Sequence, residues 1–401
     1  MSDILWLFQQ RLPPNLRLFP SSSMFEMSND GTVIIDKPSG LQSNEKGHDR
    51  LRASKFRLRT SRFSKTILLI LIIAAALYVL LGLLLRAANH VPISPPLPRY
   101  PSRPVPFYVA DNDTGCSSYV VPNVIHFVRF GQPNVSFMDA VSMRSAYINH
   151  APDKIVVHCD ECQLGGPLAY LIRDIPNLTI KEQHPAKTIF GREVGCIYHA
   201  SDIARLQILL EYGGIFIDND CVVINPLHPL RHYEMALGWS KGMYMASMVL
   251  LAAPGARFIR LHLELYREYN SSLWYYNVGD LPTMRLLWPH PHLIHAVPVL
   301  LGTDLNMLDK LYVPGHHPDW RSYFAVHTLI RHRCVEEDPL YGHDIDLQNV
   351  RTYNTSLGEM IREVLFGTSA FVSNDTEVRP VADLYAARRR RRVETVANKT
   401  E

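Results

Sequence analysis

Two carboxylates stand close together at Asp218-Asn219-Asp220, directly after the apolar run Ile215–Ile217. Carboxylates at positions i and i+2 repel each other unless a cation lies between them or one of them is protonated. Oxygen ligands suit Mg²⁺ or Mn²⁺, and both ions also bind diphosphates. The pair predicts a site for a divalent cation, with an acidic surface turn as the alternative interpretation.

The residues before this pair predict a helix that presents further polar groups. Ser201 is a good N-cap, and aliphatic residues recur at helical spacing over 203–210. Gly213-Gly214 predicts the end of the helix. Asp202 and Arg205 share one helix face, where an acid–base pair can hydrogen-bond sugar hydroxyls or phosphate.

Strand-like and helix-like segments alternate in the chain that precedes this helix. Alternation of this kind predicts an α/β fold with a mainly parallel sheet and covering helices, in which ligands bind at the carboxyl ends of strands. The predicted strands are Val124–Val128, Lys154–His158 and Leu178–Lys181, and the predicted helices lie near Phe137–Asn149 and Leu168–Asp174.

The combined pattern is far more specific than its parts. Ser-Asp-x-x-Arg, then Tyr-Gly-Gly, then a hydrophobic strand with Asp-x-Asp resembles the DxD-motif sugar-binding region of a retaining glycosyltransferase family. That family includes fungal initiating mannosyltransferases and animal α-1,4-galactosyl- and α-1,4-N-acetylglucosaminyltransferases. The likeness extends more thinly over 121–332. It implies a GT-A-like fold, which is a Rossmann-like mixed, mainly parallel sheet with flanking helices.

The resemblance also implies roles for single residues. Asp202 and Arg205 would hold the donor sugar. Asp218 would contact the ribose and, through water, the metal, while Asp220 would bind the metal directly. His327, in Ala-Val-His, would complete the metal or diphosphate site.

Further segments of the chain look like family blocks on the donor side. Pro122–His126 resembles the first strand of the family, and Trp274–Asn277 resembles a later block, so His126 and Asn277 are expected at the nucleotide sugar. Met245–Val249 departs from many relatives because it lacks an Asn. The implied cofactor is Mn²⁺ or Mg²⁺, and the implied donor is a nucleotide sugar, with a UDP-sugar favoured and GDP-mannose as the alternative. The acceptor would be a glycan, glycolipid or glycoprotein.

Residues 66–85 carry no charge and predict a single transmembrane helix before the folded domain. A helix of 20 residues spans the roughly 30 Å hydrocarbon core once. Basic residues cluster before this run, and Arg86 alone follows it closely. The positive-inside rule then predicts a type II signal anchor with the domain in the lumen. The basic residues are Lys55, Arg57, Arg59, Arg62 and Lys65.

Cysteines and N-glycosylation sequons (Asn-x-Ser/Thr) lie only after the predicted span. All six cysteines follow it, on the side predicted to be luminal, where an oxidising compartment favours disulfides. Together with the resemblance, this split predicts a Golgi membrane protein that is glycosylated and contains disulfides. The seven sequons begin at Asn112, Asn134, Asn177, Asn270, Asn354, Asn374 and Asn398.

The net charge is only +3, whereas a nucleic-acid-binding protein would normally carry a basic stripe or domain, so the sequence argues against a nucleic-acid partner. The predicted transmembrane helix makes the lipid bilayer an expected partner.

The predicted organisation has five parts. The parts are a mostly disordered cytosolic tail (1–65), the signal anchor (66–85), a Pro-rich stem (86–119), a luminal glycosyltransferase domain (120–375) and an Arg-rich disordered tail (376–401).

Two other functions fit part of the same pattern. Phe216–Val222 also fits the nucleophile motif of a haloacid-dehalogenase-type phosphatase, with Asp218 as the nucleophile and Asp220 as the general acid. That function leaves Asp202 and Arg205 without a role. The other alternative is a catalytically inactive, glycan-binding relative.

Cys159-x-x-Cys162 raises a separate question. Zinc would need two more ligands at suitable spacing, and none is obvious. The pattern therefore favours a disulfide over a metal site, although not necessarily between these two cysteines.

Overall fold

The computed structural model describes residues 112–302, 307–315, 317–330 and 344–400. These residues belong to one compact unit. No helix within the described ranges is both long enough and apolar enough to cross a membrane. The predicted span at 66–85, the predicted cytosolic tail and the stem as far as residue 111 lie outside the described residues.

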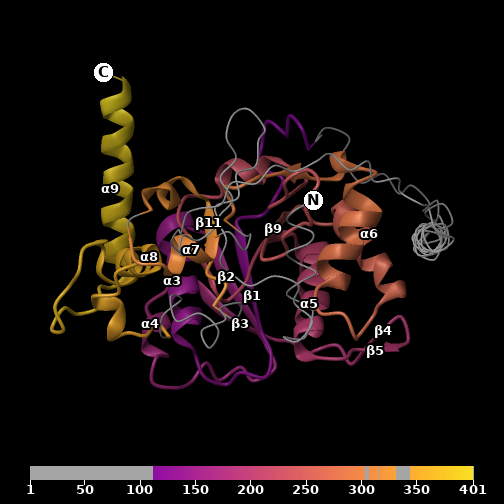
Figure 1. The fold of residues 1–401 in the computed structure, drawn as a ribbon, viewed down its shortest axis with the longest axis horizontal. Coiled ribbons are helices and arrows are strands. Elements are labelled where there is room, and N and C mark those ends of the chain that lie inside the picture. Colours follow the sequence, from indigo (N-terminus) through magenta and orange to yellow (C-terminus); the bar gives the residue numbers. More distant parts are fainter. Residues whose placement is uncertain (1–111, 303–306, 316, 331–343, 401) are drawn as a thin grey trace, which may run out of the picture. The chain divides into compact units, whose positions relative to one another are not determined.

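The central sheet of this unit has seven strands (Figure 1): β1 (Val124–Arg129), β2 (Lys154–Cys159), β3 (Leu178–Glu182), β6 (Gly214–Ile217), β8 (Met235–Leu237), β9 (Val249–Ala252) and β10 (His295–Ala296). They lie in the order β10-β8-β9-β6-β1-β2-β3. The pairs β3–β2, β2–β1, β1–β6 and β8–β10 are parallel, while β9 is antiparallel to β6 and β8. The prediction of a mixed, mainly parallel sheet is confirmed, as are the three predicted strands.

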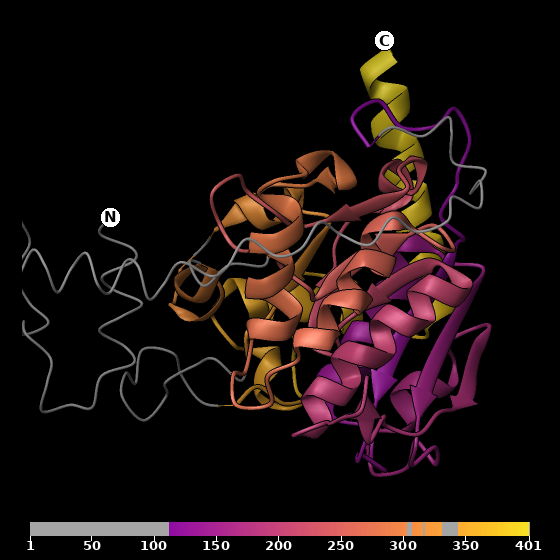
Figure 2. The same cartoon turned by 90° about the vertical axis from the view of Figure 1, so that its right-hand side faces the viewer.

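Helices cover both faces of the sheet. One layer contains α3 (Phe137–His150), α4 (Tyr170–Arg173), α8 (Ser356–Phe366) and α9 (Val381–Thr400), and the other contains α5 (Ile197–Tyr212) and α6 (Arg257–Leu265). Figure 2 views the sheet from the side of α5 and α6. Neighbouring residues of a strand point to opposite faces, so Phe127 joins the core beneath α3 and Val128 the core beneath α5. The two predicted helices correspond to α3 and α4.

The remaining elements are short. The pair β7 (Cys221–Val223) and β11 (Ala325–His327) is antiparallel, as is the pair β4 (Thr188–Ile189) and β5 (Arg192–Glu193). Helix α7 spans Met307–Tyr312. The 3₁₀ turns are His228–His232, Tyr266–Glu268, Pro291–Leu293, Pro318–Ser322 and Asn349–Arg351, and the π-helical turns are Tyr276–Asp280 and Thr283–Leu287.

Helix α5 begins earlier than its capping residue predicts. The N-cap is Cys196, and Ser201 lies inside the helix, so the prediction of Ser201 as N-cap is wrong. The extra turn carries His199, which is buried and has its Nδ1 2.6 Å from Tyr269 Oη. Tertiary contact of this kind overrides a local preference for a cap.

The Gly-Gly turn ends α5 as predicted and leads directly into β6. Gly213 has φ 63° and Gly214 has φ 103°, both in the left-handed region that favours glycine. A Cβ at Gly213 would lie 2.5 Å from Cδ of Pro254, and one at Gly214 would lie 2.7 Å from the carbonyl oxygen of Val124. Two glycines are therefore needed for the close approach of the backbone to Pro254 and Val124 where β6 begins.

The C-terminal tail is not disordered as predicted for 376–401, because α9 occupies most of it. This helix packs beside α3 (Figure 1), and Leu384 is only 2% exposed. Arg388 Nη1 lies 3.2 Å from Glu363 Oε2, and Arg392 donates to a backbone carbonyl of α3 at 2.9 Å. Residues four apart share a helix face, so the ends of the arginine run dock the helix.

The end of the predicted stem also belongs to the folded unit. Asn112 is 2% exposed, and its side-chain amide donates to the carbonyl of His292 at 3.2 Å. The backbone N–H of Cys116 donates to the carbonyl of His232 at 2.7 Å. The domain therefore begins before the predicted boundary at residue 120.

Candidate active site

The Asp218–Asp220 turn lies at the carboxyl end of β6, between that strand and β7. The backbone N–H of Asp218 donates to the carbonyl of Met248 at 2.9 Å, and the N–H of Cys221 donates back to the carbonyl of Asp218 at 3.1 Å. The Asn219 side chain donates to the carbonyl of Val128 at 2.8 Å. The middle residue of the motif thus anchors the turn on β1 and leaves the two aspartates for chemistry.

Arg205 joins three groups that come from different elements. Its Nη2 lies 3.0 Å from Asp202 Oδ1 and 3.3 Å from Asp218 Oδ1, while its Nη1 donates to the carbonyl of Ser247 at 3.0 Å. The guanidinium also lies 4.4 Å from the ring centroid of Phe216, which fixes its plane. The predicted Asp202–Arg205 pair is therefore in place and directed at the first aspartate of the motif.

Burial dominates the electrostatics of this cluster. It raises the pKa of Asp202 to about 7, against the opposing effect of the Arg205 charge and with a further increase from Asp218. Burial by itself would lower the pKa of Arg205, but Asp218 and Asp202 together raise it. Arg205 thus remains a cation, and Asp202 exchanges a proton near neutral pH.

A buried aromatic group lies close to the Asp202–Arg205 pair and was not predicted from the sequence. Tyr266 is 1% exposed, and burial and then the Asp202 charge raise the pKa of its hydroxyl. That hydroxyl has no hydrogen-bond partner among the described residues. Tyr275 donates from its hydroxyl to the carbonyl of Met245 at 2.7 Å, which ties the Trp274–Asn277 block to the segment that holds Arg205.

The second aspartate of the motif faces a different partner. His327 Nε2 lies 3.1 Å from Asp220 Oδ1, and the N–H of Thr328 donates to the carbonyl of Asp220 at 2.9 Å. Donor atoms of Asp220, Cys221 and His327 all lie within 4.8 Å of one another, a spacing at which one metal ion can be held. Asp218 is not in this group, because its carboxylate lies beside Arg205.

Cys221 is a buried thiol next to the two carboxylates. Burial raises its pKa well above the ordinary value, and the charges of Asp220 and Asp218 raise it further. The predicted site residues do not include Cys221, although it directly follows Asp220 in the sequence.

His126 lies outside the Asp–Arg cluster. It is in register with Phe216 on the neighbouring strand β6, and Phe216 precedes Asp218 by two residues. Its ring nitrogens lie 3.1 Å from His158 Nε2 and 3.1 Å from the carbonyl of Gly213. Burial, together with the nearby His158, lowers the pKa of His126 to about 3, so the neutral ring serves as a buried connection between β1, β2 and the Gly-Gly turn.

Asn277 is also occupied elsewhere. Its side-chain amide donates to the carbonyl of Asn270 at 2.8 Å and its side-chain oxygen accepts from the N–H of Asn270 at 2.8 Å. Its backbone carbonyl lies 3.1 Å from His262 Nε2. These bonds close the loop of residues 270–277 and use the groups that the resemblance assigned to the donor.

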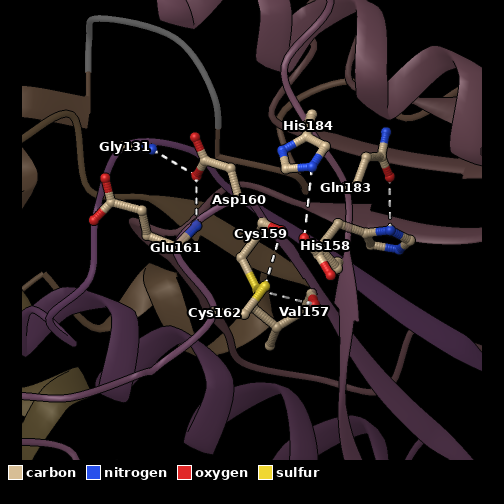
Figure 3. The surroundings of a disulfide bond; sticks show 10 residues. Gly131, Val157, His158, Cys159, Asp160, Glu161, Cys162, Gln183 and His184 are labelled. Carbon is tan, nitrogen blue, oxygen red and sulfur yellow. Dashed lines mark hydrogen bonds and ion pairs between the residues drawn. A yellow bond between two sulfur atoms is a disulfide. The ribbon is translucent and has the colours of Figure 1, made fainter.

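Cys159 and Cys162 form a disulfide at the carboxyl end of β2, which confirms the preference for a disulfide over zinc (Figure 3). Asp160, inside this loop, accepts hydrogen bonds from the backbone N–H groups of Gly131 at 2.8 Å and Glu161 at 2.9 Å. The Asp160 carboxylate thus connects the segments that follow β1 and β2, at the same edge of the sheet that carries the Asp218–Asp220 turn.

Comparison with known proteins gives a family for this region. The model of the glycosyltransferase sugar-binding region containing the DXD motif matches residues 140–237. Glucan organizing enzyme 1 of Cryptococcus neoformans is 26% identical over 268 residues, which cover 61% of this chain and 70% of that protein. Human α-1,4-N-acetylglucosaminyltransferase is 27% identical over 133 residues, which cover 32% of this chain and 38% of that enzyme.

Among solved structures, the glycosyltransferase GlyE of Streptococcus pneumoniae aligns with a TM-score of 0.35 and 13% identity, over 67% of this chain and 63% of that one. Residues 140–237 include α5, the Gly-Gly turn and the Asp218–Asp220 motif, which are the parts that carry the predicted resemblance. The predicted resemblance is therefore confirmed: residues 140–237 match the glycosyltransferase sugar-binding region that contains the DXD motif.

Proposed function

We propose that this enzyme transfers a sugar from a nucleotide-sugar donor to a hydroxyl of a glycan, glycolipid or glycoprotein, with a divalent cation and with retention of configuration. The observation that carries this proposal is the Arg205 guanidinium, which contacts both Asp202 and Asp218 beside the Asp220–His327 pair. One half of the site offers paired charges to a sugar and the other offers ligands to a cation.

The residues present fit a divalent cation. The carboxylate of Asp220, after β6, and the imidazole of His327, on β11, have ligand atoms within 4.8 Å of each other, and both kinds of ligand bind Mn²⁺. Asp220 and His327 would hold the cation directly, and Asp218 would do so through water. When bound, the cation would neutralise the diphosphate and stabilise the departing nucleotide.

Asp202 and Arg205 would hold the donor sugar. A carboxylate and a guanidinium that are already paired keep fixed directions, so sugar hydroxyls can replace part of each contact without reorganising the protein. Arg205 also places positive charge beside the departing diphosphate. We do not propose that His126 and Asn277 bind the donor, because other residues of the domain already hydrogen-bond to their side chains.

Retention has two possible chemical routes. Double displacement requires a carboxylate beneath the sugar ring, as in retaining glycosidases. Asp202 and Asp218 are both paired with Arg205, which weakens them as nucleophiles. We therefore favour attack by the acceptor on the same face from which the nucleotide leaves, with the departing phosphate accepting the proton of the acceptor hydroxyl.

The donor is proposed from the resemblance and from the names of two relatives. The resemblance favours a UDP-sugar over GDP-mannose. The name of the human relative points to transfer of N-acetylglucosamine, and that of the fungal relative concerns glucan. A hexosyl or N-acetylhexosaminyl donor is therefore the first to test.

We also propose that a single transmembrane helix at 66–85 anchors the enzyme in the Golgi membrane with the catalytic domain in the lumen. The flanking charges support this topology. Asn134, Asn177, Asn270, Asn354 and Asn374 are all exposed, as glycosylation sites must be, whereas Asn112 is buried. The Cys159–Cys162 disulfide is consistent with an oxidising compartment.

The test is a donor screen on the purified full-length chain in detergent. UDP- and GDP-sugars are supplied with Mn²⁺, with Mg²⁺ or with a chelator, and release of the nucleotide is measured. We expect cation-dependent hydrolysis of one donor class, and transfer once a glycan acceptor is added. Release of inorganic phosphate from a phosphomonoester, with a phosphoaspartyl adduct at Asp218, would instead support the phosphatase alternative.

A further inference from the structure

Cys221 and His327 lie directly opposite each other on neighbouring strands. In the antiparallel pair β7–β11, residue 327 is in register with residue 221. Side chains of residues in register lie on the same face of a sheet, with Cβ atoms about 4.5–5.5 Å apart. The thiol of Cys221 and the imidazole of His327 are therefore directed to one place.

Asp220 supplies a third donor atom at that place. Its carboxylate oxygen lies 3.1 Å from His327 Nε2, and the sulfur of Cys221 lies within 4.8 Å of both partners. Cys221 is completely buried, whereas the side chains of Asp220 and His327 are 15% and 6% exposed. The sulfur thus forms the floor of the group, and the oxygen and nitrogen lie nearer to solvent.

The chemistry of these three atoms differs from that of a site built from carboxylates and imidazole alone. Zinc bonds thiolate sulfur at about 2.3 Å, imidazole nitrogen at about 2.0–2.1 Å and carboxylate oxygen at about 2.0–2.2 Å. A soft sulfur ligand selects Zn²⁺, Cd²⁺ or Co²⁺ rather than Mn²⁺ or Mg²⁺. Atoms within 4.8 Å of one another reach one such ion after small side-chain movements.

We propose that Cys221, Asp220 and His327 form a binding site for a thiophilic divalent cation, with Zn²⁺ as its first representative, and that this site fills without any nucleotide sugar. Three protein ligands would hold the ion and a water would fill its fourth position, so no diphosphate is needed to complete the set. On binding, a metal–sulfur bond forms, the S–H bond of Cys221 breaks and its proton passes to the buffer.

This proposal rests on the proposed function only in that it concerns the same end of β6. If it holds, the two kinds of cation compete for Asp220 and His327. The thiophilic ion occupies them before a donor arrives, whereas Mn²⁺ binds them together with the diphosphate.

The test is a titration of the purified, metal-free full-length chain with Cd²⁺ or Co²⁺ in the absence of any nucleotide. We expect one ion per chain, with thiolate-to-metal charge-transfer absorption in the ultraviolet. Cys221→Ser should abolish that absorption and weaken binding at least 10-fold. Cys116→Ser, which changes a free, half-buried thiol elsewhere, serves as the matched control and should leave the absorption intact.

X-ray absorption of the Zn²⁺-loaded wild-type chain gives a result that does not depend on whether Cys221→Ser folds. A single sulfur neighbour at about 2.3 Å is expected. A shell of only oxygen and nitrogen, or charge-transfer absorption that persists in a folded Cys221→Ser protein, overturns the proposal. Sulfur ligation in a chain that hydrolyses no nucleotide sugar would reject the proposed function alone.

Discussion

His327 Nε2 lies 3.1 Å from Asp220 Oδ1, although 107 positions separate the two residues in the chain. The contact exists because β11 pairs with β7, the strand that begins directly after Asp220. The first aspartate of the motif contacts a different residue, because Asp218 Oδ1 lies 3.3 Å from Arg205 Nη2. The two aspartates of one short motif therefore connect the cation half of the site with the sugar half.

Asp220→Asn removes a charge from the cation half and keeps the size of the side chain. We expect cation-dependent turnover to fall by roughly 100-fold or more, because even indirect partners of a metal cost about 10–100-fold when they are changed. The melting temperature should change little, since loss of repulsion with Asp218 partly offsets the lost contact to His327. Asp375→Asn, at an exposed position, is the control. Equal turnover in both variants would remove Asp220 from the site.

Arg205→Lys tests the sugar half. A single ammonium group cannot reach Asp202, Asp218 and the carbonyl of Ser247 at once, so buried groups lose their partner. Each such loss costs about 1–3 kcal/mol, and kcat/KM for the donor should fall at least about 10-fold. The control, Arg267→Lys, changes an exposed pair with Glu264. Thermal unfolding and donor kinetics that match this control would contradict the assignment.

Asp202 predicts a pH-dependent contribution to stability. Its pKa is raised from 3.8 to about 7 in the folded chain, so the folded state binds a proton more tightly than the unfolded state between these values. Stability that comes from this group is therefore lost as the pH rises from about 4 to 7, by at most about 1.4 kcal/mol per pH unit.

The measurement is the free energy of unfolding of the wild type minus that of Asp202→Asn, followed over this pH range. The difference should decrease with pH and level off above about 7, because the asparagine does not titrate. A difference that rises with pH would mean that Arg205, rather than burial, dominates the pKa of Asp202.

Gly214→Ala should disturb both the fold and the site. The new Cβ would lie 2.7 Å from the carbonyl of Val124, at a backbone φ of 103°. We expect a loss of a few kcal/mol in stability and reduced donor binding, because β6 carries the aspartate turn at its end. Gly242→Ala, with φ 89° and no atom within 4 Å of its Cβ, isolates the backbone strain from the clash. Equal losses in the two variants would show that the clash is unimportant.

Leu384→Ala tests whether α9 belongs to the folded unit. Leu384 is 2% exposed in the core shared with α3 and α8, so truncation should cost about 2–5 kcal/mol. Val393, on the same helix, is 64% exposed, and Val393→Ala should change stability by less than about 0.5 kcal/mol. Denaturant unfolding of the two variants decides the matter, since a disordered tail would make them indistinguishable.

Local patterns in the sequence were sufficient to predict the structure of the segment that leads to the Asp218–Asp220 motif. The aliphatic spacing before Gly213 specified a helix, the glycine pair its end and Ile215–Ile217 a buried strand, and all three are observed. Each of these features depends on neighbours within a few residues, through helical or strand periodicity and the backbone freedom of glycine. The placement of Asp202, Arg205 and Asp218 near one another follows from the same short segment.

Contacts between distant segments depended on tertiary structure. Periodicity shows which face of a segment is buried but not which segment covers it. Ser247 beneath Arg205 and Cys221 opposite His327 result from the pairing of β9 with β6 and of β11 with β7. The arginine run of α9 had the composition of a solvated tail. It is instead docked, because Leu384 and two arginines find partners on α3 and α8 that are far away in the sequence.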